Sequence, residues 1–330
     1  MLTRRSALVA TVAATLSRPA LAQSRIKVRI AGGGITIYGY MPFFVAQAQG
    51  LFAKHGIDAE VAQFPGGSRA MQAVLGGSSD VACGFYEHTV QMAAKGAHLV
   101  AFVLQTQDSG LVLGVRKQLA DKVNTAADLK GLKIGVSAPG SATHLFAMVL
   151  MVKAGIKGTD AAAVGVGTTQ TAVSAFERGD VDALSMFDPI IADLERRGEI
   201  KIIGDARASE NTKRIFGGPY ASGTLYGEAG WVAKNEAAVR GCAAAIREAT
   251  VFLQQASPQQ AIDALGAGMC FVGMDVCTAG FTANRDAFDH DGRVQPAMAE
   301  TVKRTLASFD PAIAAANVDT AATFTDKYLA

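Results

Sequence analysis

Residues 77–85, GSSDVACGF, return at a constant offset of 102 residues as residues 179–187, GDVDALSMF. The similarity extends over residues 66–103 and 168–205. Each copy predicts a helix, a G-x-x-D turn, a short apolar strand, a second helix and another strand. Two similar α/β units imply two lobes that face each other, and a cleft between lobes is a usual place for a small ligand.

The first 22 residues predict an export signal that is removed from the mature protein. Arg4 and Arg5 precede an apolar run over 7–16, and Ala20-Leu21-Ala22 has the small-x-small pattern of a cleavage site. A twin-arginine signal and a general secretory signal fit equally well. The next residue is Gln23 and not cysteine, so we expect no lipid anchor and a periplasmic location.

Composition limits the partners of the mature chain. Removal of the signal takes three arginines and leaves 28 basic and 29 acidic residues, a formal charge of −1. That balance gives no electrostatic reason to expect nucleic acid or an anionic membrane as a partner. No later segment has 18 uninterrupted apolar residues, so we expect a soluble protein, and its length suggests two domains. We also expect a monomer.

Cysteine pairing is left open by the sequence. The mature chain has four cysteines, and they are Cys83, Cys242, Cys270 and Cys277. An oxidising compartment permits a bridge between Cys270 and Cys277, but free buried cysteines are also common and no C-x-x-C spacing is present.

Motifs of enzymes, cofactors and metals are missing from the sequence. It has no P-loop and no H-E-x-x-H, and Gly32-Gly33-Gly34 lacks the G-x-G-x-x-G spacing of a dinucleotide site. Residues 135–139 approach a nucleophile elbow but end in proline. His88 and His144 lack the spaced partners of a metal site. The sequence therefore predicts a protein that is not an enzyme, with no cofactor and no metal.

The order of predicted elements favours two doubly wound, parallel α/β halves. The first half has predicted strands and helices over 26–31, 43–50, 58–64 and 69–75. The second half begins with a strand over 111–115. After a Gly-rich crossing, one more strand is predicted over 230–233, and the remainder from residue 236 is predicted to be mostly amphipathic helix.

With these elements in place, the chain resembles the substrate-binding proteins of ABC importers in the sulfonate, nitrate, taurine and thiamine-precursor (NMT1/THI5-like) group. The resembling residues, within residues 26–235, are Pro42, Ala46 and the segments 50–52, 56–57, 66–68, 77–82, 128–136 and 179–183. The resemblance implies a type II periplasmic-binding-protein fold, with two doubly wound α/β lobes joined by a two-strand hinge. It divides the mature chain into a first lobe, residues 23–108 and 224–330, and a second lobe, residues 109–223.

The same resemblance implies a function in transport. A protein of this kind closes on a small solute and delivers it to the transmembrane permease subunits of an ABC transporter. Two alternatives stay open, namely a pyrimidine-precursor synthase of the same superfamily and an exported sensor without its own permease. Sulfonates, nitrate-like anions, pyrimidines and aromatic acids are all candidate ligands, and the aromatic content of the loops favours an organic one.

The candidate binding site comprises the loops at the carboxyl ends of the predicted strands, where ligands of open parallel sheets lie. Gly67 and Ser68 begin a helix, whose free N–H groups favour an anion or a polar oxygen. Glu87 and Asp188, in matching loops, are expected to face a cationic or hydrogen-bond-donating group. The predicted ligand-binding residues are Tyr38, Tyr40, Gly67, Ser68, Phe85, Tyr86, Glu87, His88, Gln105, Ser141, Thr143, Thr168, Asp188 and Tyr220.

Several of these polar residues also have a purely structural interpretation. Ser68, Ser141 and Thr143 have the residue types and positions of helix caps. Asp80 and Asp182 are expected to be structural, because aspartate in a G-x-x-D turn caps the local backbone whether or not a ligand binds.

Overall fold

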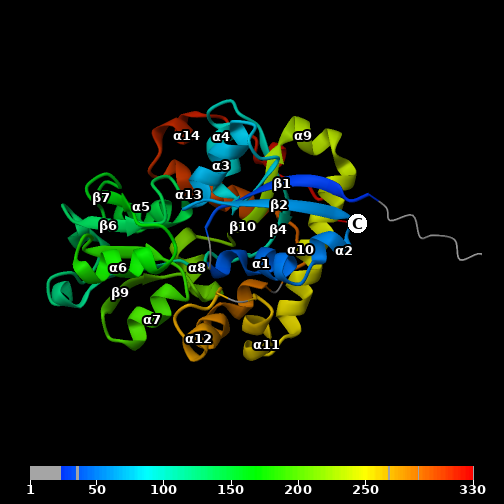
Figure 1. The fold of residues 1–330 in the computed structure, drawn as a ribbon. Coiled ribbons are helices and arrows are strands. Elements are labelled where there is room, and N and C mark those ends of the chain that lie inside the picture. The colour runs from blue at the N-terminus through cyan, green and yellow to red at the C-terminus, as the bar shows by residue number, and fades with distance from the viewer. Residues whose placement is uncertain (1–23, 35–36, 267, 289, 330) are drawn as a thin grey trace, which may run out of the picture.

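Two five-stranded sheets flanked by helices organise the protein (Figure 1). The computed structural model describes residues 24–34, 37–266, 268–288 and 290–329. The predicted export signal, residues 1–22, lies outside the described residues. Among the described helices, none is long and apolar enough to cross a bilayer.

The first sheet combines four early strands with one later strand. Its order is β2 (Ile57–Gln63), β1 (Ile26–Gly32), β3 (Val81–Phe85), β10 (Gly223–Glu228) and β4 (Leu99–Leu104). Strand β1 pairs in parallel with β2 and β3, whereas β10 runs antiparallel to β3 and β4. The sheet is therefore mixed, where the sequence pattern predicted parallel strands alone.

The second sheet repeats this arrangement. Its order is β7 (Ala162–Gly165), β6 (Lys133–Val136), β8 (Ala183–Met186), β5 (Val112–Arg116) and β9 (Ile200–Asp205). Here β5 is the antiparallel strand, between β8 and β9. Each sheet thus takes as its antiparallel strand the one that follows a crossing from the other sheet. We call each sheet with its helices a lobe, and the two doubly wound α/β lobes confirm the predicted fold class.

One predicted strand is wrong. Residues 230–233 belong to helix α9 (Ala229–Lys234), and the strand is β10, immediately before it. Thr224 and Tyr226 of β10 are fully buried in the middle of the sheet, whereas α9 is largely exposed. A central strand must be buried on both faces, and β10 satisfies that condition although it contains two glycines.

Helices cover both sheets. Helices α3 (Gly67–Leu75) and α4 (Glu87–Ala93) pack against the first sheet, and α5 (Ala142–Lys153), α6 (Gln170–Arg178) and α7 (Ile190–Arg196) pack against the second. The other α-helices are α1 (Met41–Ala48), α2 (Leu51–Lys54), α8 (Ser209–Phe216), α10 (Glu236–Gln255), α11 (Pro258–Asp263), α12 (Met274–Asn284), α13 (Pro296–Ala307) and α14 (Pro311–Ala315). Short 3-10 helices span Tyr38–Tyr40, Lys117–Leu119, Ala126–Leu129, Arg285–Phe288 and Thr320–Thr323.

The two copies of the repeat fold alike, as predicted. In each copy the G-x-x-D aspartate accepts a hydrogen bond from the backbone N–H of a neighbouring strand, Asp80 from Arg29 and Asp182 from Lys133, both at 2.9 Å. The aspartates are structural, but they tie the turn to β1 or β6 and do not only cap the local backbone. The turn before β3 or β8 is thereby fixed to the sheet.

The C-terminal region adds helices on both sides of the junction between the lobes. Helix α12 lies beside α7 of the second lobe (Figure 1). Cys270 and Cys277 form a disulfide at the start of α12, which answers the question that the sequence left open. Cys83 and Cys242 are free and buried.

Two crossings connect the lobes and touch each other. The backbone N–H of Ser222 donates to the carbonyl oxygen of Thr106 at 3.1 Å, and the N–H of Gly223 donates to the Thr106 hydroxyl at 2.9 Å. The two crossings are therefore adjacent to each other at the junction of the lobes.

Candidate functional site

The carboxyl ends of β3 and β8 face each other across the junction of the lobes. Phe85 ends β3 and Phe187 follows β8, and their ring centroids lie 5.4 Å apart. Tyr40 packs edge-on against Phe85 at 5.5 Å. The strand ends at Phe85 and Phe187, with Tyr40, therefore meet in one buried region between the lobes.

The N-termini of α3 and α5, from opposite lobes, meet through two serines. The backbone N–H of Ser68 donates to the Ser141 hydroxyl, and that hydroxyl donates to the hydroxyl oxygen of Ser68, each at 3.0 Å. The Ser68 hydroxyl donates in turn to the carbonyl oxygen of Pro139 at 3.0 Å. Ser141 occupies the N-cap position of α5, but its side chain does not cap that helix. It satisfies a first-turn N–H of the facing helix instead.

Glycine is required where these elements come together. A Cβ on Gly66 would lie 2.8 Å from the hydroxyl oxygens of Ser137 and Ser141. A Cβ on Gly67 would lie 2.7 Å from Cε1 of His88. The absence of these two side chains lets the start of α3 approach both the second lobe and the His88 ring.

His88 is fully buried and carries an unsatisfied ring nitrogen. Its Nδ1 shares a 3.0 Å hydrogen bond with the Tyr226 hydroxyl, while Nε2 has no hydrogen-bond partner among the described residues. Burial lowers the pKa of His88 to about 4, and the backbone of Gly140 from the other lobe opposes that shift. The imidazole is therefore neutral near pH 7.

Glu87 is buried beside it at the start of α4. The Tyr220 hydroxyl donates to its carboxyl at 3.3 Å, and Tyr220 stacks on Phe216 with centroids 3.9 Å apart. Burial raises the pKa of Glu87 to about 8, against the opposing effect of the Tyr220 hydrogen bond. This carboxyl is therefore largely protonated at neutral pH.

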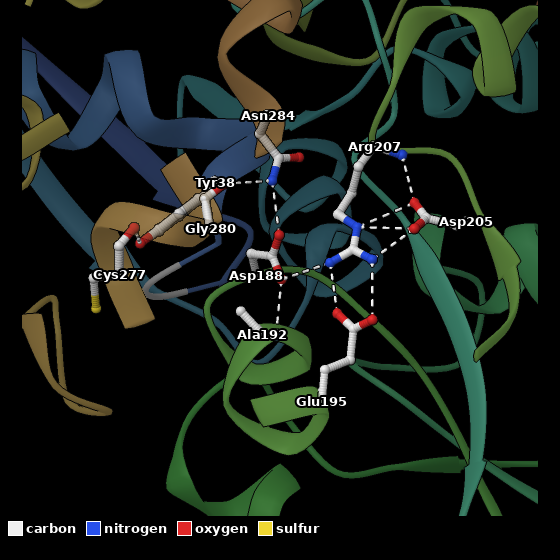
Figure 2. Close-up of polar contacts among 9 residues, drawn as sticks. All are labelled: Tyr38, Asp188, Ala192, Glu195, Asp205, Arg207, Cys277, Gly280 and Asn284. Carbon is white, nitrogen blue, oxygen red and sulfur yellow. Dashed lines mark hydrogen bonds and ion pairs between the residues drawn. The ribbon is translucent and has the colours of Figure 1, made fainter. Parts of the chain in front are cut away.

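Asp188, the other predicted acid, is held by protein groups (Figure 2). One oxygen accepts from the Ala192 N–H at 3.0 Å and lies 3.7 Å from Arg207, and the other accepts from the Asn284 amide at 2.8 Å. Burial raises the pKa of Asp188 to about 6, and Arg207 opposes that shift. Because Glu87 and Asp188 have separate protein partners, a ligand group shared between them stays a prediction.

Three other predicted site residues form hydrogen bonds with groups of the protein itself. The Tyr38 hydroxyl donates to the carbonyl of Cys277 at 2.8 Å, Gln105 accepts from the Phe43 N–H at 3.1 Å, and Tyr86 shares a hydrogen bond with Thr323. Tyr38 and Tyr40, two residues apart, diverge toward α12 and Phe85.

The remaining predicted residues lie in the second lobe. Thr143 accepts from the Ser137 N–H at 2.9 Å, and the Thr168 side chain would lie 3.2 Å from a Cβ on Gly34 of the first lobe. Tyr226 was not among the predicted site residues, because its segment was not predicted to be a strand. Arg69, next to the loop at the start of α3, is exposed and donates to Gln72 on its own helix. Arg207, 3.7 Å from Asp188, is paired with Glu195 and Asp205.

A hollow marks the edge of this junction. It has a volume of about 450 Å³, and its lining residues are Gln63, Phe64, Pro65, Gly165, Val166, Gly167, Thr168, Thr169 and Thr171. These residues follow β2 in one lobe and β7 in the other, so the hollow opens at the seam between the lobes. Across the described residues, no group of histidine, cysteine or acidic side chains is arranged to hold a metal.

Proteins of similar sequence match this chain over most of its length. Residues 25–265 match the NMT1-like family. A protein of Brucella abortus (strain 2308) named as a binding protein is 28% identical over 262 residues, which cover 79% of this chain and 77% of the relative.

Solved structures share the fold. A protein of Bordetella bronchiseptica RB50 is 37% identical, with a TM-score of 0.90 over 93% of this chain and 96% of that chain. The alkanesulfonate-binding protein SsuA of Xanthomonas axonopodis pv. citri, solved with MOPS bound, is 18% identical, with a TM-score of 0.73 over 91% and 98% of the two chains. The protein therefore belongs to the NMT1-like family and has the periplasmic-binding-protein fold.

Proposed function

We propose that this protein is the solute-binding component of an ABC importer and traps a small organic solute by lobe closure. Relatives named as binding proteins support this function. The observation that carries the proposal is the direct contact of Ser68 and Ser141 at facing helix N-termini, beside the unsatisfied Nε2 of His88. Neutral polar groups from both lobes converge on one buried place.

The proposed lobes comprise residues 23–108 with 224–330, and residues 109–223. The hinge is at the two crossings, near residues 107–111 and 219–225. A solute that touches both lobes only in the closed arrangement binds that arrangement more tightly, and this difference in affinity drives closure. The permease then recognises the closed protein in the periplasm.

An organic solute is favoured over a doubly charged inorganic anion. Sites for such anions often use arginine forks, and the guanidinium of Arg69 points along its own helix instead. Phe85, Phe187 and Tyr40 supply aromatic surface at the junction. The unsatisfied Nε2 of His88 is available to a polar atom of the solute.

A ligand screen on the mature protein tests this function. Sulfonates, nitrate-like anions, pyrimidines and aromatic acids are added separately, and a ligand of the native state raises the melting temperature. We expect one class to do so, with the solute recovered unchanged after denaturation of the complex. Conversion of the solute would instead favour the synthase, and no stabilisation by any class would contradict solute capture.

A further inference from the structure

Helix α12 lies across the junction of the lobes and contacts both of them (Figure 2). A Cβ on Gly280, in the middle of the helix, would lie 3.1 Å from the Cβ of Asp188 and 3.1 Å from Cε2 of Tyr38. Tyr38 follows β1 of the first lobe, and Asp188 follows β8 of the second. The helix thus fits between strand-end loops of opposite lobes because glycine occupies its point of closest approach.

The first lobe holds α12 at both ends. The Tyr38 hydroxyl donates to the carbonyl oxygen of Cys277 at 2.8 Å, and the disulfide of Cys277 with Cys270 ties this turn to the preceding segment. Beyond the other end, the guanidinium of Arg285 donates to the carbonyl oxygen of Gln254 on α10 at 2.9 Å. Helix α12 is therefore attached to the first lobe by contacts that do not involve the second.

The contact with the second lobe is a buried hydrogen bond to a carboxylate. The Asn284 amide donates to Asp188 at 2.8 Å, and the Asp188 side chain is fully buried. At the surface, Arg196 of α7 and Asp275 of α12 add an exposed ion pair. The buried bond is the stronger constraint, because exposed ion pairs contribute little and hydrogen bonds to charged groups contribute more.

The partners of Asp188 differ in their dependence on closure. Ala192 and Arg207 belong to the same lobe as Asp188, so their contacts persist when the lobes separate. Asn284 alone comes from the helix that is attached to the other lobe. Asn284 also lies at the hinge, since a Cβ on Gly110 of the first crossing would be 2.7 Å from its Oδ1, and Gly110 has a φ of 63° that suits glycine.

The geometry points to α12 as a strap that stabilises the closed arrangement through the Asn284–Asp188 hydrogen bond. This bond forms when the lobes close and is lost when they part, so it sets the fraction of closed protein and the residence time of the solute. The effect on residence time rests on the proposed function, whereas the effect on closure can be measured without any solute.

The test compares N284A with T282A, a control on the exposed side of the same helix. Spin labels are placed at K95C and K130C, exposed positions in the first and second lobes, and the interlobe distance distribution is measured without solute. We expect N284A to shift the closed-to-open ratio by about tenfold toward open, because it removes one hydrogen bond to a buried charged group. T282A should match the wild type.

Solute kinetics separate the strap from the proposed function. With a bound solute in hand, N284A should raise the dissociation rate by about tenfold and change the association rate little. A shifted distance distribution in a protein that binds no tested solute would support the strap and count against solute capture.

A second variant keeps the proposal testable if N284A does not fold. R196A removes only the exposed ion pair, cannot expose the core, and should shift the distribution in the same direction by a smaller amount, an effect abolished at high salt. The proposal would be overturned if both variants had the interlobe distance distribution of the wild type and N284A only lowered the melting temperature. That result would show that α12 moves with the second lobe.

Discussion

Phe85 and Phe187 occupy equivalent positions of the internal repeat and meet across the two lobes, with ring planes inclined at 42°. Each residue lies at the carboxyl end of a buried strand, so the repeat brings the same side chain to the junction from both sides. Their contact is apolar, whereas the contact of Ser68 with Ser141 between the same lobes is polar. The junction of the lobes therefore combines aromatic packing with hydrogen bonds.

A double-mutant cycle tests the role of this ring pair. We expect F85L and F187L to couple by about 0.5–1.5 kcal/mol, and the coupling should appear in solute affinity because the rings belong to different lobes. The matched control is Phe43 with Phe52, a ring pair within the first lobe at 5.7 Å. Its coupling should appear in the free energy of unfolding alone. Equal behaviour of the two pairs would argue against closure at the Phe85 contact.

Ser141 and Ser257 provide a second matched comparison. Ser257 caps its own helix by accepting from the Gln260 N–H, so S257A should cost about 1 kcal/mol of stability and leave solute affinity unchanged. Ser141 does not cap α5 and reaches Ser68 instead, so S141A should weaken solute binding by about tenfold with a smaller loss of stability. Calorimetric titration and urea unfolding measure the two effects. The reverse assignment would make Ser141 an ordinary cap.

The internal repeat, together with the glycines at turns and at the ends of elements, allowed most of both lobes to be predicted from the sequence. Apolar strands such as β3 and β8, and the G-x-x-D turns before them, are local features that a sequence displays directly. Strand β10 was misplaced because its central position depends on pairing with β3 and β4, far away in the chain. Its sequence, GTLYGE, gives no strong local sign of burial.

Side-chain directions at the candidate site were less predictable. Tyr38 and Tyr40 are two residues apart in a 3-10 turn, where alternate residues do not share a face as they do in a strand. Their divergence toward α12 and Phe85 follows from that turn. The docking of α12 on Asp188 depends on tertiary packing, and no pattern within residues 274–284 indicates which lobe it contacts.

The G-x-x-D aspartates should matter for stability and not for binding. Asp182 accepts from the Lys133 N–H, so D182A should cost about 1–2 kcal/mol in urea unfolding. The nearby D180A, which removes an exposed ion pair with Arg178, should cost at most about 0.5 kcal/mol. Neither change should alter solute affinity, and a selective loss of affinity in D182A would place this residue in the site after all.

The pH dependence of stability tests the environment of Glu87. Its pKa of about 8 in the folded protein exceeds the value near about 4.3 of an unfolded chain. Between these values the folded state holds a proton that the unfolded state has released, so the free energy of unfolding falls as pH rises through this window. E87Q removes the titration, and its advantage over the wild type should grow to at least about 1 kcal/mol by pH 8.

His88 titrates in part of the same range with the opposite sign. Its pKa of about 4 lies below the usual value, so its contribution to stability is lost as pH falls below about 6.5. Both E87Q and the wild type retain His88. Its contribution therefore cancels when the free energy of unfolding of one protein is subtracted from that of the other. Urea unfolding at pH 5 and pH 8 measures the difference, with E60Q, a half-exposed surface carboxyl, as the control. If the difference in free energy of unfolding between E87Q and the wild type did not change with pH, Glu87 would reach solvent or a cation in the folded protein. Only an unfavourable buried charge on Glu87 makes E87Q increasingly more stable than the wild type as pH rises.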